Sequence, residues 1–249
     1  MLNFNDIPSL IFTLVAVLIT LTVHEYAHGY AAYRLGDNTA KSFGRLTLNP
    51  IKHLDPIGAV CLLLFHFGWA KPVPINPRNF KKPRRDFAIS ALAGPLTNII
   101  LAFITAFFYL LALTQLSKIS YDSEFTYNLA LNTIRFLGIF HSVNLGLGIF
   151  NLIPVPPLDG SRILTVVLPP KLYFGIMKYE RKIYLVLIIW MLLGGFVKRF
   201  LLSFSFISSS PVLSFIAGIF SLSGMISSLI SFLSGAMLDF WSLLPFLQI

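Results

Sequence analysis

An uncharged, mostly apolar run from Ile7 to Val23 leads directly into the motif His24-Glu25-Tyr26-Ala27-His28. No helix breaker follows the first turn of this stretch, so His24 and His28 fall four positions apart on one helical face. Two imidazoles at this spacing can bind one Zn²⁺, with Glu25 beside them as a general base that activates water. The alternative is three ionisable side chains that share an interfacial helix by chance. Ionisable groups in a membrane helix are costly and usually functional, which favours the metal site.

The composition indicates a membrane protein. The 249 residues are 56% hydrophobic and 12% charged, with a mean hydropathy of +0.78, which is typical of a chain that crosses the bilayer several times. No polar block is long enough for a second globular domain, so we expect one integral membrane domain over residues 1–249. Its catalytic core would occupy residues 7–168 and its C-terminal helices residues 183–249. Its single cysteine, Cys61, excludes an internal disulfide.

The charges are sorted by loop, which predicts an all-α polytopic fold with a defined orientation. Five apolar segments would form about five transmembrane helices: 7–33, 87–115, 127–150, 183–197 and 211–234. The connection 34–86 carries ten Lys or Arg against three Asp, the connection 160–182 five against one Glu, and the connection 117–126 is net acidic. The positive-inside rule then places the N-terminus outside and both basic connections in the cytosol, although Lys198-Arg199 count against this topology. The net charge of +9 therefore reflects membrane topology, and we expect no nucleic-acid partner.

A second feature lies near residues 44–78. The apolar stretch from Ile57 to Trp69 is too short to span a bilayer, and Lys71-Pro72-Val73-Pro74-Ile75-Asn76-Pro77 follows it. We interpret this region as a re-entrant or interfacial excursion followed by an extended, β-like segment. An edge strand beside the metal could pair with an unwound substrate, which makes Trp69, Lys71, Pro72 and Val73 candidate substrate-binding residues. The alternative is a rigid loop that only caps the helices.

A catalytic zinc needs a third protein ligand. Arg34 stands where the third histidine of a metzincin-like motif would fall, segment 87–115 carries no charge, and Glu124 lies on the opposite side of the membrane. The predicted topology brings the inner end of segment 127–150 level with that of segment 7–33. Prolines interrupt the helix there, and Asp159 follows them as a candidate oxygen ligand. An ordinary Asp-Gly interfacial turn is the alternative.

Together these motifs resemble the site-2 protease family of intramembrane zinc metalloproteases, in its small prokaryotic form without a PDZ or nucleotide-binding domain. The resemblance covers most of residues 8–200 and rests first on His24-Glu25-x-x-His28 and on Asn151…Pro154…Leu158-Asp159-Gly160. Four further motifs contribute: Gly44-Arg45-x-Thr47-x-Asn49-Pro50, His53-x-Asp55-Pro56-x-Gly58, Gly68-Trp69-Ala70-Lys71-Pro72-Val73-Pro74 and Ala93-Gly94-Pro95.

The resemblance implies a site and an activity. One catalytic zinc would be bound by His24, His28 and Asp159, Glu25 would act as the acid/base, and Asn151 would hold the substrate or the oxyanion. The enzyme would hydrolyse peptide bonds within or next to transmembrane segments of membrane proteins, which is regulated intramembrane proteolysis. Its partners would be transmembrane substrates and membrane lipid, in a multi-pass cell-membrane protein whose active site opens towards the cytosol.

Several residues and functions stay open at this point. Asn144 shares a helical face with Asn151 and is a second candidate for contacting substrate or orienting a ligand, although interhelical hydrogen bonding is favoured for it and for His141. Turn-capping or loop-packing roles are favoured for His53, Asp55 and His66, which could otherwise bind metal. A membrane zinc carrier, or a non-catalytic metal protein, is the alternative function. A carrier would need several intramembrane ligands along a path, and it would not need Glu25 beside the histidines. A membrane peptidase with soluble substrates, such as signal-peptide remnants, is a third interpretation.

Overall fold

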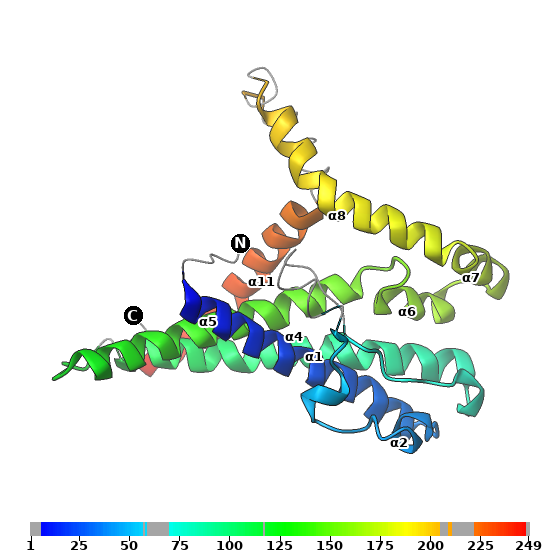
Figure 1. The fold of residues 1–249 in the computed structure, drawn as a ribbon, viewed down its shortest axis with the longest axis horizontal. Helices are drawn as coiled ribbons and strands as arrows, with labels where there is room; N and C mark the ends of the chain where they lie inside the picture. Colours follow the sequence, from blue (N-terminus) through cyan, green and yellow to red (C-terminus); the bar gives the residue numbers. More distant parts are fainter. Residues whose placement is uncertain are drawn as a thin grey trace.

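The computed structural model describes residues 6–56, 58, 70–116, 118–204, 209–210 and 222–247, which are almost entirely helical or in turns. Three long helices, α1 (Ile7–Arg34), α4 (Pro83–Leu116) and α5 (Glu124–Leu152), pack against one another and form the centre of the molecule (Figure 1). The other helices are α2 (Thr39–Ser42), α6 (Asp159–Val167), α7 (Pro170–Met177), α8 (Glu180–Leu202) and α11 (Leu222–Ser242). Three 3₁₀ turns complete the described chain: η1 (Pro50–Lys52), η2 (Pro77–Asn79) and η3 (Pro245–Leu247).

Four described helices are long and apolar enough to cross a membrane: α1, α4, α5 and the part of α11 from Gly224 to Ser242. The predicted segment 183–197 lies inside α8, which forms a continuous helix. The fold is therefore that of an all-α polytopic membrane protein, as the sequence predicts.

The ends of α1 follow from its flanking residues. The Asp6 carboxylate caps the N-terminus, because it accepts hydrogen bonds from the backbone N–H (3.2 Å) and the hydroxyl (2.9 Å) of Ser9. At the other end Gly36 has a φ of +108°, a conformation that glycine adopts without a steric penalty. The helix that carries the histidine motif thus has the length that the apolar run predicts.

Helix α4 begins earlier than predicted and runs through Pro95. Pro83 supplies the first residue of the helix, and the Asp86 carboxylate accepts the backbone N–H of Lys82 at 2.9 Å, so the charged residues before Phe87 form its first turn. The sequence Gly94-Pro95 by itself predicts a kink or an entry bend, because proline disrupts a helix, but the pair lies inside the continuous helix α4. Gly94 lies against the imidazole rings of His24 and His28, where a side chain would not fit.

Helix α11 packs on α4 and α5 through apolar and polar contacts. Ile226, Ile230, Leu233 and Met237 pack against the buried side chains of Ala102, Leu145 and Ile149. His141 of α5 donates from Nδ1 to the Ala102 carbonyl at 2.9 Å, and its Nε2 lies 2.8 Å from the Ser234 hydroxyl. His141 thus makes the interhelical hydrogen bonds that the sequence favours for it. The helix ends at Ser242 rather than near Ser234, and the predicted residues 211–221 lie outside the described part.

No regular strand occurs in the described residues of the region 44–78. It holds one isolated antiparallel bridge, between Leu54 and Ala70, and the Lys71 N–H donates to the His53 carbonyl at 2.8 Å. The excursion predicted for Ile57–Trp69 lies almost wholly outside the described residues. The β-like character of the segment is thus limited to this bridge.

Candidate metal centre

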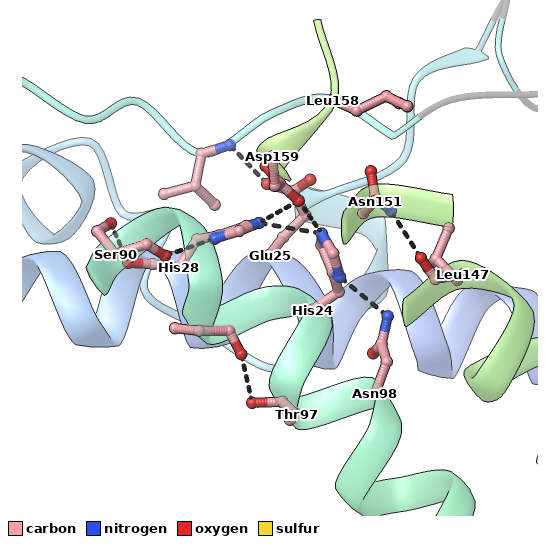
Figure 2. Close-up of polar contacts among 12 residues, drawn as sticks. His24, Glu25, His28, Ser90, Thr97, Asn98, Leu147, Asn151, Leu158 and Asp159 are labelled. Carbon is pink, nitrogen blue, oxygen red and sulfur yellow. Dashed lines mark hydrogen bonds and ion pairs between the residues drawn. The ribbon is translucent and has the colours of Figure 1, made fainter. Parts of the chain in front are cut away.

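Three side chains from two helices converge beside α4. His24 and His28 come from α1, and Asp159 is the first residue of α6 (Figure 2). The two Nε2 atoms lie 3.0 Å apart, and Asp159 Oδ2 lies 3.1 Å from that of His24 and 3.2 Å from that of His28. All three candidate ligand atoms fall within 4.8 Å of one another. The structure therefore brings together the three residues that the sequence proposes as metal ligands.

Asp159 reaches the histidines because α6 is tied to the rest of the core. A Cβ at Gly160 would collide with the Leu152 carbonyl oxygen and lie 2.5 Å from that of Ile153, so only glycine allows this approach to the end of α5. At the other end of α6, Arg84 donates to the carbonyls of Thr165 (2.6 Å) and Leu168 (2.5 Å). The Thr165 hydroxyl returns a hydrogen bond to the Arg84 carbonyl at 3.1 Å. These contacts fix the position of the carboxylate.

Helix α4 supplies no candidate ligand, yet one face of it lines the site. His28 Nδ1 donates to the Ser90 carbonyl at 2.8 Å, and the Asn98 amide lies 2.9 Å from His24 Nδ1. Between them, a Cβ at Gly94 would collide with His28 Nε2 and lie 2.8 Å from His24 Cε1. Positions 90, 94 and 98 are spaced by four residues, as the two histidines are, so two helical faces meet in register.

The donor set suits a divalent cation such as zinc. Because His28 Nδ1 donates to Ser90, its Nε2 is left to present a lone pair towards His24 and Asp159. An ionised oxygen ligand and two imidazole nitrogens form a set that zinc prefers, with a position left open for catalysis.

Solvent access is uneven around these side chains. The side chains of His24 and His28 are only 5% and 8% exposed, whereas that of Asp159 is 23% exposed. The two imidazoles are enclosed by helices, and the carboxylate marks the more open side. Water that takes part in a reaction would reach the site from this side.

Glu25 is held by the main chain rather than by another side chain. Its Oε2 accepts the backbone N–H of Val73 at 2.8 Å. The Val73 side chain is buried, and a Cβ at Gly29 would lie 3.1 Å from its Cγ1, so the absence of a side chain at Gly29 makes room for it. This contact fixes one carboxylate oxygen of Glu25 and leaves the other to take up a proton.

The segment that carries Val73, residues 71–79, is anchored on both sides. Arg45 donates to the Lys71 carbonyl at 2.6 Å. The Asp37 carboxylate accepts the Asn76 N–H and the Asn79 amide, both at 2.7 Å. Burial raises the pKa of the Asp37 carboxyl, but hydrogen bonds from Thr39, Asn79 and Asn76 lower that pKa more, so it lies below its ordinary value. The carboxylate is therefore ionised at neutral pH, and this anchor weakens only as the pH falls through that lowered pKa.

The remaining predicted residues differ in how deeply they are buried. Asn151, near the end of α5, donates from Nδ2 to the Leu147 carbonyl at 3.0 Å and is half-buried (Figure 2). Lys71 and Pro72 are exposed, whereas Asn144 is fully buried within the bundle. Trp69 and His66 lie outside the described residues.

His53 and Asp55 have the local contacts that the sequence favours. The His53 ring is buried and its Nε2 lies 2.8 Å from the Thr47 carbonyl oxygen. Asp55 accepts the Gly58 N–H at 2.9 Å. Neither belongs to the group of His24, His28 and Asp159.

The sequence interpretation missed the contribution of α4. It treated Gly94 as part of a bend and did not single out Ser90 or Asn98. The signal was present, since Ser90, Gly94 and Asn98 repeat the four-residue spacing of the histidines on a segment without charge. The contact between Ser90 and His28 Nδ1 is made by the main-chain carbonyl of Ser90, so the residue type at this position does not disclose the contact.

Replacing Gly94 with alanine is expected to weaken zinc binding about tenfold or more, because the new Cβ would push one or both imidazoles out of position. Chelator competition on purified protein would measure the change. Gly235→Ala is the matched control, since a Cβ at Gly235 in α11 would have no neighbour within 4 Å. Wild-type zinc affinity in Gly94→Ala would show that the imidazoles do not depend on this close approach.

The fold and the site define a class: a multi-pass membrane zinc metalloprotease. Comparison with known families agrees. The chain belongs to peptidase family M50, the site-2 protease family, whose family model matches residues 12–194.

Curated relatives carry the same description. The chain is 48% identical over 163 residues to "Putative zinc metalloprotease YwhC" of Bacillus subtilis, which covers 66% of this chain and 70% of the relative. It is 32% identical over 158 residues to "Putative zinc metalloprotease Rip2" of Mycolicibacterium smegmatis and 30% identical over 162 residues to the protein of that name in Mycobacterium tuberculosis. Each of these matches covers 62% of this chain and 56% of the relative, so the chain spans just over half the length of the mycobacterial proteins. No solved structure shows a significant match to the chain.

Proposed function

We propose that this protein hydrolyses peptide bonds within or next to the transmembrane segments of other membrane proteins, as an enzyme of regulated intramembrane proteolysis. The observation that carries the proposal is the His-His-Asp group, in which Glu25 lies beside the two histidines on one membrane helix and Asp159 joins them from α6. The site-2 protease family acts on membrane-protein substrates, which supports the same substrate class.

In this proposal His24, His28 and Asp159 hold one zinc ion. Zinc bound there would supply Lewis-acid activation of water and of the substrate carbonyl. The oxygen of Glu25 that Val73 does not engage accepts a proton from the attacking water. As the peptide C–N bond breaks, Glu25 returns this proton to the leaving amine. The side-chain amide of Asn151 binds the substrate or the developing oxyanion near the end of α5.

The substrate must be unwound at the scissile bond, because a helical backbone keeps its carbonyls in internal hydrogen bonds. Segment 71–79 offers an anchored main chain beside Glu25 along which an extended peptide could lie. Pro72 and Pro74 lack N–H donors, so main-chain pairing along this segment would be limited. In this proposal Lys71, Pro72 and Val73 line the substrate path, and Trp69, which lies outside the described residues, is a further candidate for substrate binding. Asn144 is fully buried and would orient neighbouring groups within the bundle.

The proposed orientation places the N-terminus outside and the active site towards the cytosol. Arg34 lies ten residues beyond His24, which is about 15 Å along a helix. The metal site would then lie below the cytosolic surface and be reached from it, with residues 7–168 as the catalytic core of a single domain. The basic connections on that side agree with the positive-inside rule.

A zinc carrier is the second candidate, and the structure favours it less. A carrier would need metal ligands at several depths. Within the described residues, His24, His28 and Asp159 are the one group of three ligands close enough to share an ion. A carrier also gives no reason to hold a carboxylate beside that group through Val73.

The test uses the zinc-loaded protein in lipid vesicles with a designed single-span peptide as substrate. Gly and Pro destabilise a helix interior by about 1 and 3 kcal/mol, so a peptide with a central Gly-Pro pair should be cleaved several-fold faster than its all-leucine counterpart. A zinc chelator should stop the cleavage and added zinc should restore it. Cleavage of only a water-soluble version would indicate a peptidase for soluble substrates. Zinc flux across the vesicle without any cleavage would indicate the carrier.

A further inference from the structure

Asn98 of α4 places its side-chain amide within hydrogen-bond distance of the imidazole ring of a candidate metal ligand. It is fully buried, and its Nδ2 lies 2.9 Å from His24 Nδ1 (Figure 2). Its carbonyl oxygen, Oδ1, is buried without a hydrogen-bond partner. A buried amide oxygen without a hydrogen-bond partner loses its contact with water and gains nothing in return, so this arrangement is unfavourable.

The role of His24 decides what Asn98 must offer. A neutral imidazole that gives one nitrogen to a metal carries its proton on the other. His24 points Nε2 at His28 and Asp159, so Nδ1 carries the proton and needs an acceptor. The neighbouring His28 shows the completed arrangement, because its Nδ1 donates to the Ser90 carbonyl at 2.8 Å.

The Asn98 amide can meet this need without any change in packing. Its nitrogen and oxygen are nearly equal in size, so a half-turn of the amide places Oδ1 against His24 Nδ1. The same half-turn directs the NH₂ group to where Oδ1 was, and this donor then needs an acceptor of its own.

Helix α5 offers such an acceptor at the right level. His141 meets the Ala102 carbonyl, and a Cβ at Gly148 would lie 3.4 Å from Asn98 Cβ, so these two positions bracket Asn144 opposite α4. Asn144 is fully buried and donates from Nδ2 to the Phe140 carbonyl at 2.9 Å. Its Oδ1 is buried without a partner and is thus available to accept.

We propose that Asn98 is a positioning residue of the metal centre: its side-chain carbonyl accepts the Nδ1–H of His24 and aims the Nε2 lone pair at the metal, while its NH₂ group donates to Asn144. The inference rests on the proposed metal site. It gives both histidines an acceptor from α4, a main-chain one for His28 and a side-chain one for His24. It also replaces the predicted substrate contact of Asn144 with a structural role, two hydrogen bonds away from the ligand His24.

The experiment compares the zinc affinities of Asn98→Leu, Asn98→Ala and Asn98→Asp by chelator competition on purified full-length protein. Loss of an outer partner of a metal-bound histidine commonly weakens metal binding about 10- to 100-fold, and we expect this for the Leu and Ala variants. Aspartate can only accept, so Asn98→Asp should stay within about threefold of wild type or bind more tightly. The visible absorption bands of the Co²⁺-substituted protein should shift in the Leu variant and stay close to wild type in the Asp variant.

Each result has a defined meaning. Wild-type affinity in Asn98→Leu, with loss only in Asn98→Ala, would overturn the proposal in favour of simple packing. Equal loss in Asn98→Asp and Asn98→Leu would overturn it by showing that His24 needs a donor at this place. If the Asp variant does not fold, the Leu and Ala pair still decides between hydrogen bonding and packing. Asn128→Leu, an exposed asparagine of α5, is the control for the substitution itself.

One further variant separates failure of this inference from failure of the site. Asp159→Ala removes a proposed ligand and should lose zinc whatever Asn98 does. Normal zinc binding in Asn98→Leu together with loss in Asp159→Ala would refute only the positioning role. Normal binding in both would refute the metal site on which it rests.

Discussion

Replacing Glu25 with glutamine is expected to abolish peptide cleavage while zinc stays bound. Glutamine has nearly the same size and can still accept the Val73 N–H through its carbonyl, so the local structure should persist. It cannot take up a proton from water, and general acid–base catalysis contributes about 10²- to 10⁴-fold. We therefore expect a fall in kcat of that size, with zinc content and substrate affinity close to wild type. Single-turnover cleavage of the vesicle-bound peptide and metal analysis of the same preparation would measure both.

Glu124→Gln is the matched control for this change. Glu124 is exposed in the first turn of α5, at the opposite end of that helix from Asn151, so its replacement should leave cleavage unchanged. A Glu25→Gln enzyme that keeps wild-type kcat would remove Glu25 from the chemistry and leave the proton transfer to another group. Loss of zinc in Glu25→Gln would instead assign the carboxylate to the metal site.

The sequence predicts the position of the histidines well because one local pattern determines it. An uncharged run followed by two histidines four apart specifies both a membrane helix and a shared face, and α1 has that form. Asp159 required a longer argument through topology, because it is distant from the histidines along the chain. The prolines after Asn151 end α5 and allow α6 to start with the carboxylate at the level of the histidines.

Contacts made by main-chain groups were beyond sequence reasoning. Glu25 is held by the Val73 N–H and His28 by the Ser90 carbonyl. Every residue has a main-chain carbonyl, and every residue except proline has an N–H, so the side chains at these positions do not disclose the contacts. Only the path of the chain places them. The same limit applies to the start of α4, which Pro83 and Asp86 shift into a charged stretch that hydropathy alone assigns to the loop.

Helix α4 shows why an uncharged segment can still determine a metal site. The Ser90 carbonyl accepts the Nδ1–H of His28, and the Asn98 amide contacts His24 Nδ1. Between them, Gly94 has no side chain, which leaves room for both imidazole rings. Arg84 at the start of α4 holds α6 and hence Asp159. One helix without a ligand of its own therefore sets the positions of all three ligands.

Replacing Asp159 with alanine is expected to weaken zinc binding by more than about 100-fold, beyond the range for outer partners of a ligand, because it removes the only charged member of the set. The two imidazoles would remain in α1, supported by Ser90 and Asn98, but two neutral nitrogens hold zinc far less tightly than three ligands. Metal analysis of protein purified in detergent should show about one zinc per wild-type chain and little in the variant. This measurement needs no substrate.

Asp122→Ala is the control for Asp159→Ala, since it removes an exposed carboxylate from the loop before α5. Cleavage should fall with zinc content in Asp159→Ala, and excess zinc should restore part of both, because His24, His28 and Glu25 are still present. Unchanged zinc in Asp159→Ala would exclude this carboxylate as the third ligand. His53 would then be tested next, although its ring is buried against the Thr47 carbonyl and would have to turn away from that contact to bind metal.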